Sequence, residues 1–116
     1  MILVVDDEPS ICELMKAYLE VEGFDVITAT NGLDGLSRFR ENESNIRMVV
    51  TDLDMPAMNG SEMIRQMYRI APAIKIIVAS GQSLPYVMAN EPREGTSCLQ
   101  KPYTGRELTD AVRHLL

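Results

Sequence analysis

Two kinds of hydrophobic pattern alternate along the chain. Short, nearly continuous apolar runs occupy residues 2–7, 25–29, 48–52, 74–80 and 96–101. Runs of this length that are rich in Val, Ile and Leu, with apolar side chains at successive positions, are typical of parallel strands covered on both faces. The pattern therefore predicts five buried strands.

The segments between these runs show helical spacing. Apolar residues recur three and four positions apart in 10–22, 32–42, 60–70 and the last segment, which opens at Thr104. Such spacing places them on one face of a helix. The residues on these faces are Ile11, Leu14, Met15, Tyr18, Leu19, Leu33, Leu36, Phe39, Met63, Ile64, Met67, Ile70, Leu108, Val112 and Leu115.

Boundary signals support these helices. Ser10 with Glu13, and Thr104 with Glu107, have the spacing of capping boxes. Gly23 provides a stop for the first helix. Between the last two strands, the prolines of residues 82–94 leave room for about two helical turns, so a short or irregular helix is expected there.

Strands and helices thus alternate five times, which predicts one α/β domain over residues 1–116. With right-handed crossovers, this order makes a doubly wound, five-stranded parallel sheet with helices on both faces. Ligands of such sheets bind beyond the carboxyl ends of the strands, where the strand order reverses. The polar residues at those ends are therefore the candidates for chemistry.

Composition narrows the function. The chain has 116 residues and a net charge of −6, and this sign argues against direct nucleic-acid binding. No apolar run approaches the roughly 20 residues of a membrane span, and no signal peptide is recognised. Cys12 and Cys98 lack disulfide or metal-site spacing. A cytoplasmic protein without direct membrane contact is expected.

Polar residues follow the predicted strands at one edge of the sheet. Asp6 and Asp7 end the first strand, Asp52 the third, Ser80 the fourth and Lys101 the fifth. Close carboxylates repel by roughly 1 to 4 kcal/mol per pair, and one lysine cannot neutralise three of them. Mg²⁺, which takes oxygen ligands and keeps positions for water and phosphate, fits this set. Asp7 and Asp52 suit direct ligation, and Asp6 an outer position through a water.

The same residues suit phosphoryl transfer. A carboxylate such as Asp52 is already ionised at neutral pH and can attack phosphorus to form an aspartyl-phosphate. Such transfer depends on positioning and charge stabilisation more than on acid–base catalysis. Lys101 supplies a positive charge for the phosphoryl oxygens, and Ser80 supplies a neutral hydrogen bond.

Four sequence blocks carry a resemblance to a known family. ILVVDDEP at 2–9, VVTDLDMPAMNG at 49–60, IIVASG at 76–81 and LQKPY at 99–103 resemble the receiver domain of bacterial response regulators. The resemblance spans the whole chain in order. It implies the flavodoxin-like (βα)5 fold with strand order 2-1-3-4-5.

The resemblance also implies roles for individual residues. Asp52 is the phosphoacceptor, beside the acidic pair Asp6 and Asp7. Mg²⁺, for which Mn²⁺ could substitute, would be held by Asp7, the Asp52 side chain and the backbone carbonyl of Asp54, with Asp6 acting through water. Ser80 is the switch hydroxyl. Lys101 is the paired lysine, and its peptide bond to Pro102 is expected to be cis.

The implied function is that of a phosphorelay switch. A phosphohistidine on a histidine kinase or a histidine phosphotransfer domain donates its phosphoryl group, and the resulting conformational change controls a partner or an attached domain. The domain is not a conventional enzyme, although it catalyses its own phosphorylation and dephosphorylation. The blocks IIVASG and LQKPYTGREL favour a receiver module of a hybrid histidine kinase, with its kinase core in the parent chain, over a single-domain response regulator.

Two positions depart from the family pattern. Cys98 occupies a place where an aromatic residue usually couples to the switch hydroxyl, so a different or weaker conformational readout is expected. Asp54 adds a negative charge two residues beyond the phosphoacceptor, and its side chain is expected to face solvent.

Two rival functions fit the same residues less well. A haloacid-dehalogenase-like phosphatase also carries its nucleophile in an Asp-x-Asp, but its nucleophile strand comes first and its acidic pair last. A pseudo-receiver would keep the fold as an interaction surface without phosphorylation. The presence of all five site residues favours the phosphoacceptor.

Overall fold

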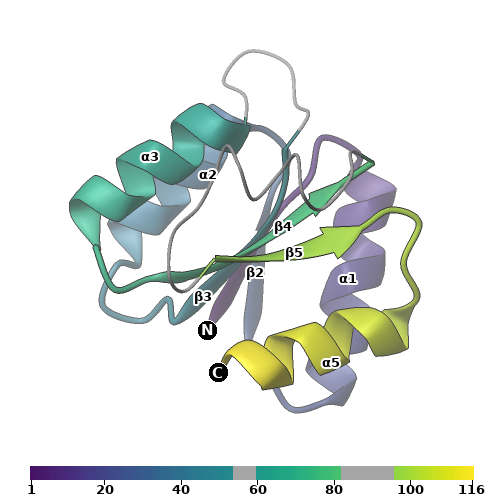
Figure 1. The fold of residues 1–116 in the computed structure, drawn as a ribbon. Helices are drawn as coiled ribbons and strands as arrows, with labels where there is room; N and C mark the ends of the chain where they lie inside the picture. Colours follow the sequence, from purple (N-terminus) through teal and green to yellow (C-terminus); the bar gives the residue numbers. More distant parts are fainter. Residues whose placement is uncertain (54–59, 82–95) are drawn as a thin grey trace.

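The computed structural model describes residues 1–53, 60–81 and 96–116. Its strands form one parallel sheet in the order β2-β1-β3-β4-β5, which confirms the predicted order (Figure 1). The strands are β1 (Ile2–Val5), β2 (Val26–Ala29), β3 (Met48–Asp52), β4 (Lys75–Ser80) and β5 (Thr96–Gln100). The order reverses direction at β1 and β3, so the chain makes its topological switch between these two strands.

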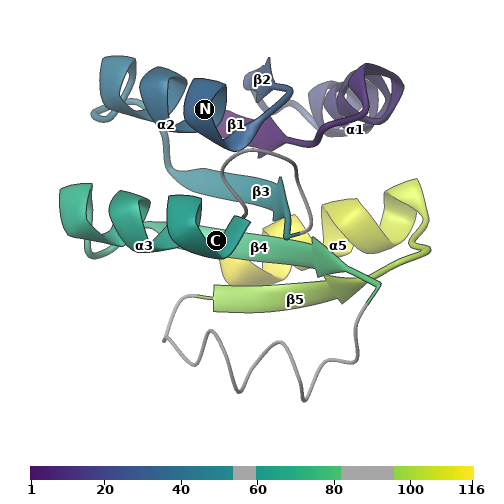
Figure 2. The same cartoon turned by 90° about the horizontal axis from the view of Figure 1, so that it is seen from above.

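Helices cover both faces of the sheet. They are α1 (Pro9–Val21), α2 (Gly32–Glu41), α3 (Gly60–Ile70) and α5 (Gly105–Leu115). Figure 2 shows α2 and α3 on one face and α1 and α5 on the other. The short or irregular helix predicted for 82–94 lies outside the described residues.

Alternating side chains of the strands build two cores. Leu3 and Val5 of β1 face the core that includes Phe39 of α2 and Met63, Ile64 and Met67 of α3. Ile2 and Val4 face the core that includes Met15, Leu19, Leu108 and Val112 of α1 and α5. The central strands are thus buried on both faces, as their continuous apolar runs predict.

The helix ends agree only partly with the predicted caps. The capping box of Thr104 and Glu107 is present, with Glu107 N donating to Thr104 Oγ1 at 3.1 Å and Thr104 N to Glu107 Oε1 at 3.1 Å. The predicted box of Ser10 and Glu13 is wrong. Glu8 is the N-cap residue of α1 and its side chain makes no capping hydrogen bond, and Pro9 already lies in the first turn. Gly23 ends α1 as predicted, with a φ of 92°.

The predicted apolar faces of the helices are wider than the buried ones. Leu14 and Tyr18 of α1 are 51% and 43% exposed, and Leu33 at the start of α2 is 59% exposed. These positions lie at the margins of the apolar stripe, and the sheet does not cover them. The exposed residues of α1 contribute instead to the groove described below.

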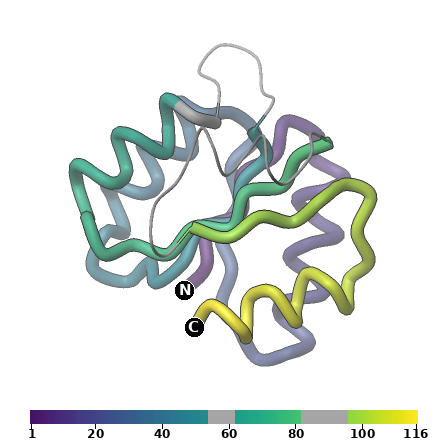
Figure 3. The backbone as a smooth tube through the Cα atoms, in the orientation of Figure 1, coloured from purple at the N-terminus to yellow at the C-terminus, as the bar shows by residue number. Residues whose placement is uncertain are grey.

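The helices return the chain to the end of the sheet where the strands begin. Both termini lie at that end (Figure 3). The carboxyl ends of the strands, where the polar residues follow, form the opposite edge of the sheet.

Candidate functional site

Two aspartates meet at the switch between the central strands. Val5 of β1 pairs with Thr51 of β3, so the residues that follow, Asp6 and Asp52, are neighbours across the sheet. Both are almost fully buried, at 2% and 3% exposure, whereas Asp7 beside them is exposed. One carboxylate oxygen from each of Asp6, Asp7 and Asp52 lies within 4.8 Å of the others. The three acidic residues therefore form one cluster, as their positions in the sequence predict.

A lysine reaches the cluster from the fifth strand. Lys101 follows β5, and its Nζ lies 3.1 Å from Asp52 Oδ2. The Lys101–Pro102 peptide is cis, which confirms that prediction. The Lys101 backbone N–H donates to the carbonyl of Ser80 at 2.9 Å, and Ser80 itself is buried at the end of β4. The structure thus brings these five predicted residues to one edge of the sheet.

The two oxygens of Asp6 have different surroundings. Oδ1 accepts a hydrogen bond of 2.9 Å from the backbone N–H of Glu8. Oδ2 is buried and has no hydrogen-bond partner among the described residues. Burial raises the pKa of Asp6 above its ordinary value, and repulsion from Asp52 adds to the rise, despite the opposing Glu8 hydrogen bond. A buried carboxylate oxygen without a donor is costly, so this atom requires a partner.

The lysine is held in its charged form. Burial lowers the pKa of Lys101, but the hydrogen bond to Asp52 and the charges of Asp52, Asp6 and Asp7 outweigh it, and the pKa rises above its ordinary value. One ammonium against three carboxylates still leaves the cluster negative. These oxygen donors, together with the unpartnered Oδ2 of Asp6, fit a hard divalent cation such as Mg²⁺ and its bound water.

Two predictions about the site have other outcomes. The expected metal-binding carbonyl of Asp54 and the orientation of its side chain lie outside the described residues. Cys98, which stands at the place of the usual aromatic residue, is half-buried. It lies on β5 opposite Val78 and packs against the core beneath α2 and α3. No aromatic ring occupies this position of the strand.

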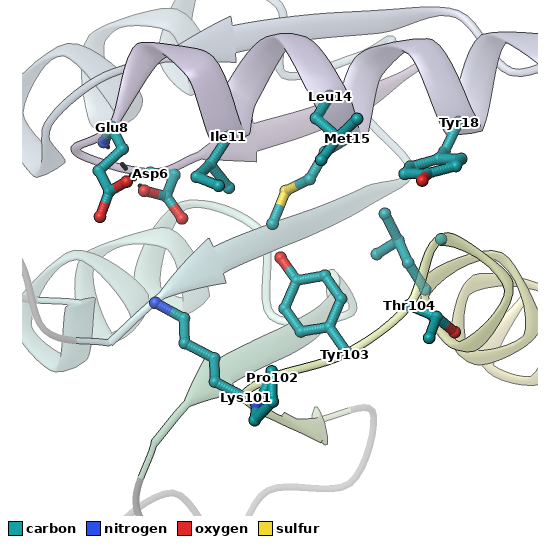
Figure 4. Close-up of a pocket in the computed structure, with 12 residues that line it drawn as sticks. Asp6, Glu8, Ile11, Leu14, Met15, Tyr18, Lys101, Pro102, Tyr103 and Thr104 are labelled. Atoms are coloured by element: carbon teal, nitrogen blue, oxygen red, sulfur yellow. Dashed lines mark hydrogen bonds between the residues drawn. The ribbon is translucent and has the colours of Figure 1, made fainter.

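The sequence did not reveal a groove that leads away from the cluster. This α1–α5 groove has a volume of about 640 Å³ and lies between α1 and the connection from β5 to α5 (Figure 4). Asp6, Glu8 and Lys101 line its polar end. Its apolar walls are Ile11, Leu14, Met15, Tyr18, Pro102, Tyr103 and Leu108. The sequence feature that could have indicated this groove is the apolar stripe of α1, which is wider than the face that the helix buries.

A glycine allows the two helices of the groove to approach. A Cβ on Gly105 would lie 2.3 Å from the Tyr18 ring, so the ring occupies the space of the missing side chain. Farther along, Arg113 of α5 pairs with Glu22 at the end of α1. These contacts set the spacing of α1 and α5.

Two further polar groups lie next to the cluster. Cys12 Sγ donates to the carbonyls of Asp6 at 3.3 Å and Ala29 at 3.4 Å, and burial raises its pKa to about 11. Tyr103 is half-buried, and burial, together with the charges of Asp6 and Asp52, raises its pKa to about 12. Both groups are protonated near neutral pH.

Comparison with known proteins identifies close relatives of the chain. The family profile described as "Response regulator receiver domain" matches residues 2–113. A transcriptional regulatory protein CpxR homolog of Haemophilus influenzae is 34% identical over 99% of this chain and 49% of its own length. The transcriptional regulatory protein GlrR of Escherichia coli is 30% identical over 96% of this chain and 25% of its own length. The chain therefore spans half or less of these two relatives.

Solved structures show the same fold. A response regulator receiver domain protein from Clostridium thermocellum superposes with a TM-score of 0.90, at 34% identity, over 98% of this chain and 91% of that chain. The receiver domain of the hybrid histidine kinase CckA superposes with a TM-score of 0.85 at 23% identity, over 99% and 97% of the two chains. Within the described ranges, none of the helices has the length and apolar character required to cross a membrane.

Proposed function

This chain belongs to the response regulator receiver domain family of two-component signalling, and we propose that Asp52 is its phosphoacceptor. Members of the family exchange phosphoryl groups with histidine kinases and phosphotransfer proteins and are not conventional enzymes. The observation that supports Asp52 is its position. It is buried at the switch between β1 and β3, beside Asp6 and 3.1 Å from Lys101 Nζ.

In the proposed reaction, a carboxylate oxygen of Asp52 attacks the phosphorus of a phosphohistidine. The new P–O bond forms as the P–N bond breaks, and the electron pair of that bond returns to the imidazole nitrogen. The Lys101 ammonium stabilises the negative charge on the phosphoryl oxygens. Dephosphorylation by water then resets the domain, and we propose that the domain catalyses this step itself.

We propose that Asp7 and Asp52 hold Mg²⁺ or Mn²⁺ directly, that the Asp54 carbonyl completes the protein ligands, and that Asp6 acts through a water. When bound, the cation neutralises negative charge on the carboxylates and on the transferred phosphoryl group. The close approach of the three carboxylates supports this assignment. Ser80 is proposed as the hydroxyl that responds to phosphorylation.

The α1–α5 groove is the proposed docking site of the phosphohistidine partner. Its polar end contains Asp6 and Lys101, so a protein seated in the groove has direct access to the phosphoacceptor. Leu14 and Tyr18 offer exposed apolar area there. An amphipathic helix of a histidine kinase or phosphotransfer domain matches this combination of an apolar wall and a polar end.

The output of the parent protein is a separate proposal. Because of the sequence blocks at 76–81 and 99–108, we favour a receiver module of a hybrid histidine kinase. A single-domain regulator is the alternative. The names of the curated relatives offer a third arrangement, a receiver joined to a transcriptional output. Neither Cys12 nor Cys98 forms a disulfide, which fits a reducing compartment, and on this ground we propose a cytoplasmic location.

Incubation with acetyl phosphate and Mg²⁺, followed by intact-mass measurement, tests the phosphoacceptor. The wild-type chain should gain one phosphoryl group, and EDTA or the Asp52→Asn substitution should prevent the gain. A wild-type chain that gains no mass would support the pseudo-receiver. Steady release of phosphate from varied phosphate esters would instead support the phosphatase.

A further inference from the structure

The buried oxygen of Asp6 raises a question that the proposed function leaves open. Asp6 is 2% exposed, and the backbone N–H of Glu8 serves only its Oδ1. Oδ2 has no partner in the described ranges. A carboxylate with one free oxygen can rotate, and an outer-sphere residue must be fixed in orientation to hold a metal-bound water.

Tyr103 carries a hydroxyl in the same place. It follows the cis Lys101–Pro102 peptide, lines the α1–α5 groove together with Asp6, and packs its ring against the core beneath α1 and α5. Figure 4 shows the hydroxyl directed toward α1 and the end of the groove where Asp6 lies. Neither the phosphoryl transfer nor the packing of the ring requires this hydroxyl.

We propose that Tyr103 is a positioning residue for magnesium binding: its hydroxyl donates a hydrogen bond to one water, which in turn donates to Asp6 Oδ2, and this bridge fixes the Asp6 carboxylate. This inference rests on the proposed magnesium-dependent phosphoacceptor function. The raised pKa of Tyr103 supports it, because burial, with the nearby charges of Asp6 and Asp52 adding to its effect, keeps the phenol in its protonated, donating form.

The electrostatics of the groove favour this water bridge. Through the water, a neutral hydroxyl offers a donor to the carboxylate without adding a charge that would compete with the cation. Hydrogen bonds to carboxylates are stronger than those between neutral groups. Lys101 serves a different acid, since its Nζ is bonded to Asp52 Oδ2.

Magnesium titration of Tyr103→Phe tests the proposal. The substitution keeps the ring and removes only the hydroxyl, so the fold and its melting temperature should remain close to those of the wild type. The Mg²⁺ dissociation constant, measured by isothermal titration calorimetry, should rise about tenfold, in the range found when partners of metal ligands are removed. An unchanged dissociation constant would overturn the proposal.

Tyr68→Phe provides the matched control. Tyr68 is also a buried tyrosine, but its hydroxyl is bonded to Thr96 in the core beneath α2 and α3. Removing the Tyr68 hydroxyl tests whether the loss of any buried hydroxyl weakens Mg²⁺ binding. The Mg²⁺ affinity of Tyr68→Phe should equal that of the wild type. An equal loss of affinity in Tyr68→Phe would overturn the proposal.

A double-mutant cycle with Asp6→Asn identifies the residue through which Tyr103 acts. If the hydroxyl acts through Asp6, Tyr103→Phe should cause no further loss of Mg²⁺ affinity in the Asp6→Asn background. A full tenfold loss in that background would overturn the proposal. Phosphorylation of the wild type by acetyl phosphate is measured in parallel, so that failure of this inference is distinguished from failure of the phosphoacceptor function.

Discussion

Lys101 Nζ and Asp52 Oδ2 lie 3.1 Å apart, although they come from the ends of different strands, β5 and β3. β4 lies between these two strands, so the lysine must reach past the end of β4 to meet the aspartate. Asp52 is buried, whereas the Lys101 side chain is 37% exposed. The pair therefore joins a buried carboxylate to a partly exposed ammonium.

Lys101→Ala should slow phosphorylation without preventing magnesium binding. Loss of one group that stabilises transition-state charge typically costs about 10²-fold in rate. The Mg²⁺ affinity should be equal or higher, because the cluster becomes more negative. Intact-mass time courses with acetyl phosphate and calorimetric Mg²⁺ titration measure the two effects. A wild-type rate in Lys101→Ala would contradict the proposed role of the lysine.

Asp7→Asn should stabilise the metal-free protein and weaken its binding of magnesium. Removing one of three close carboxylates relieves repulsion of about 1 kcal/mol, while loss of a ligand should lower Mg²⁺ affinity at least tenfold. Urea unfolding in EDTA and in excess Mg²⁺ measures both effects. Asp110→Asn, on the exposed surface of α5, controls for the change in net charge. Loss of stability of Asp7→Asn in EDTA would argue against repulsion in the cluster.

Tyr103 should make stability depend on pH in the alkaline range. Its pKa rises from 10.0 to about 12 in the folded protein, so the folded state keeps a proton that the unfolded state releases. Its contribution should be fully present below pH 10 and be lost as the pH rises through 12. Urea unfolding between pH 9 and about 12 measures this change, and Tyr103→Phe should lack that part of the dependence. In the variant, the absorbance of tyrosinate should show one fewer tyrosine that ionises near pH 12.

The two cysteines should react at different rates. Cys12 is buried with a pKa of about 11, whereas Cys98 is half-buried. Because the thiolate is the reactive form, an aromatic disulfide reagent near pH 8 should modify Cys98 first and Cys12 only on unfolding. Cys98→Ser should remove the faster phase. Two equally fast phases in the folded wild type would contradict the burial of Cys12.

Gly105→Ala should displace Tyr18 from the wall of the groove. The new Cβ would overlap the ring, but the ring is partly exposed and can turn outward, so the cost should be about 1 kcal/mol. In a Tyr18→Ala background, the same substitution should no longer destabilise, since alanine favours the helix over glycine. Urea unfolding of the four proteins measures the coupling. Additive effects would show that the ring and the glycine are energetically independent.

The sequence alone predicted the order of strands and helices, because burial of each element leaves a local period in the chain. Strand runs such as that of β3 and stripes such as that of α3 need only neighbouring residues to be recognised. The acidic cluster was also predictable, since parallel strands bring their carboxyl ends to one edge and Asp6 and Asp52 stand at those ends. The resemblance to receiver domains supplied the strand order and the cis peptide, which periodicity does not encode.

Only the tertiary structure decided how residues on separate elements meet. The capping box at Ser10 did not form because the helix already begins at Pro9, directly after the turn in which Glu8 N donates to Asp6 Oδ1. Leu14 and Tyr18 have the same spacing as core residues, yet they are exposed and border a groove. The width of that groove depends on the distance between α1 and α5. That distance is set by the fit of Tyr18 on Gly105, and such a fit between residues distant in the chain leaves no periodic signal in the sequence.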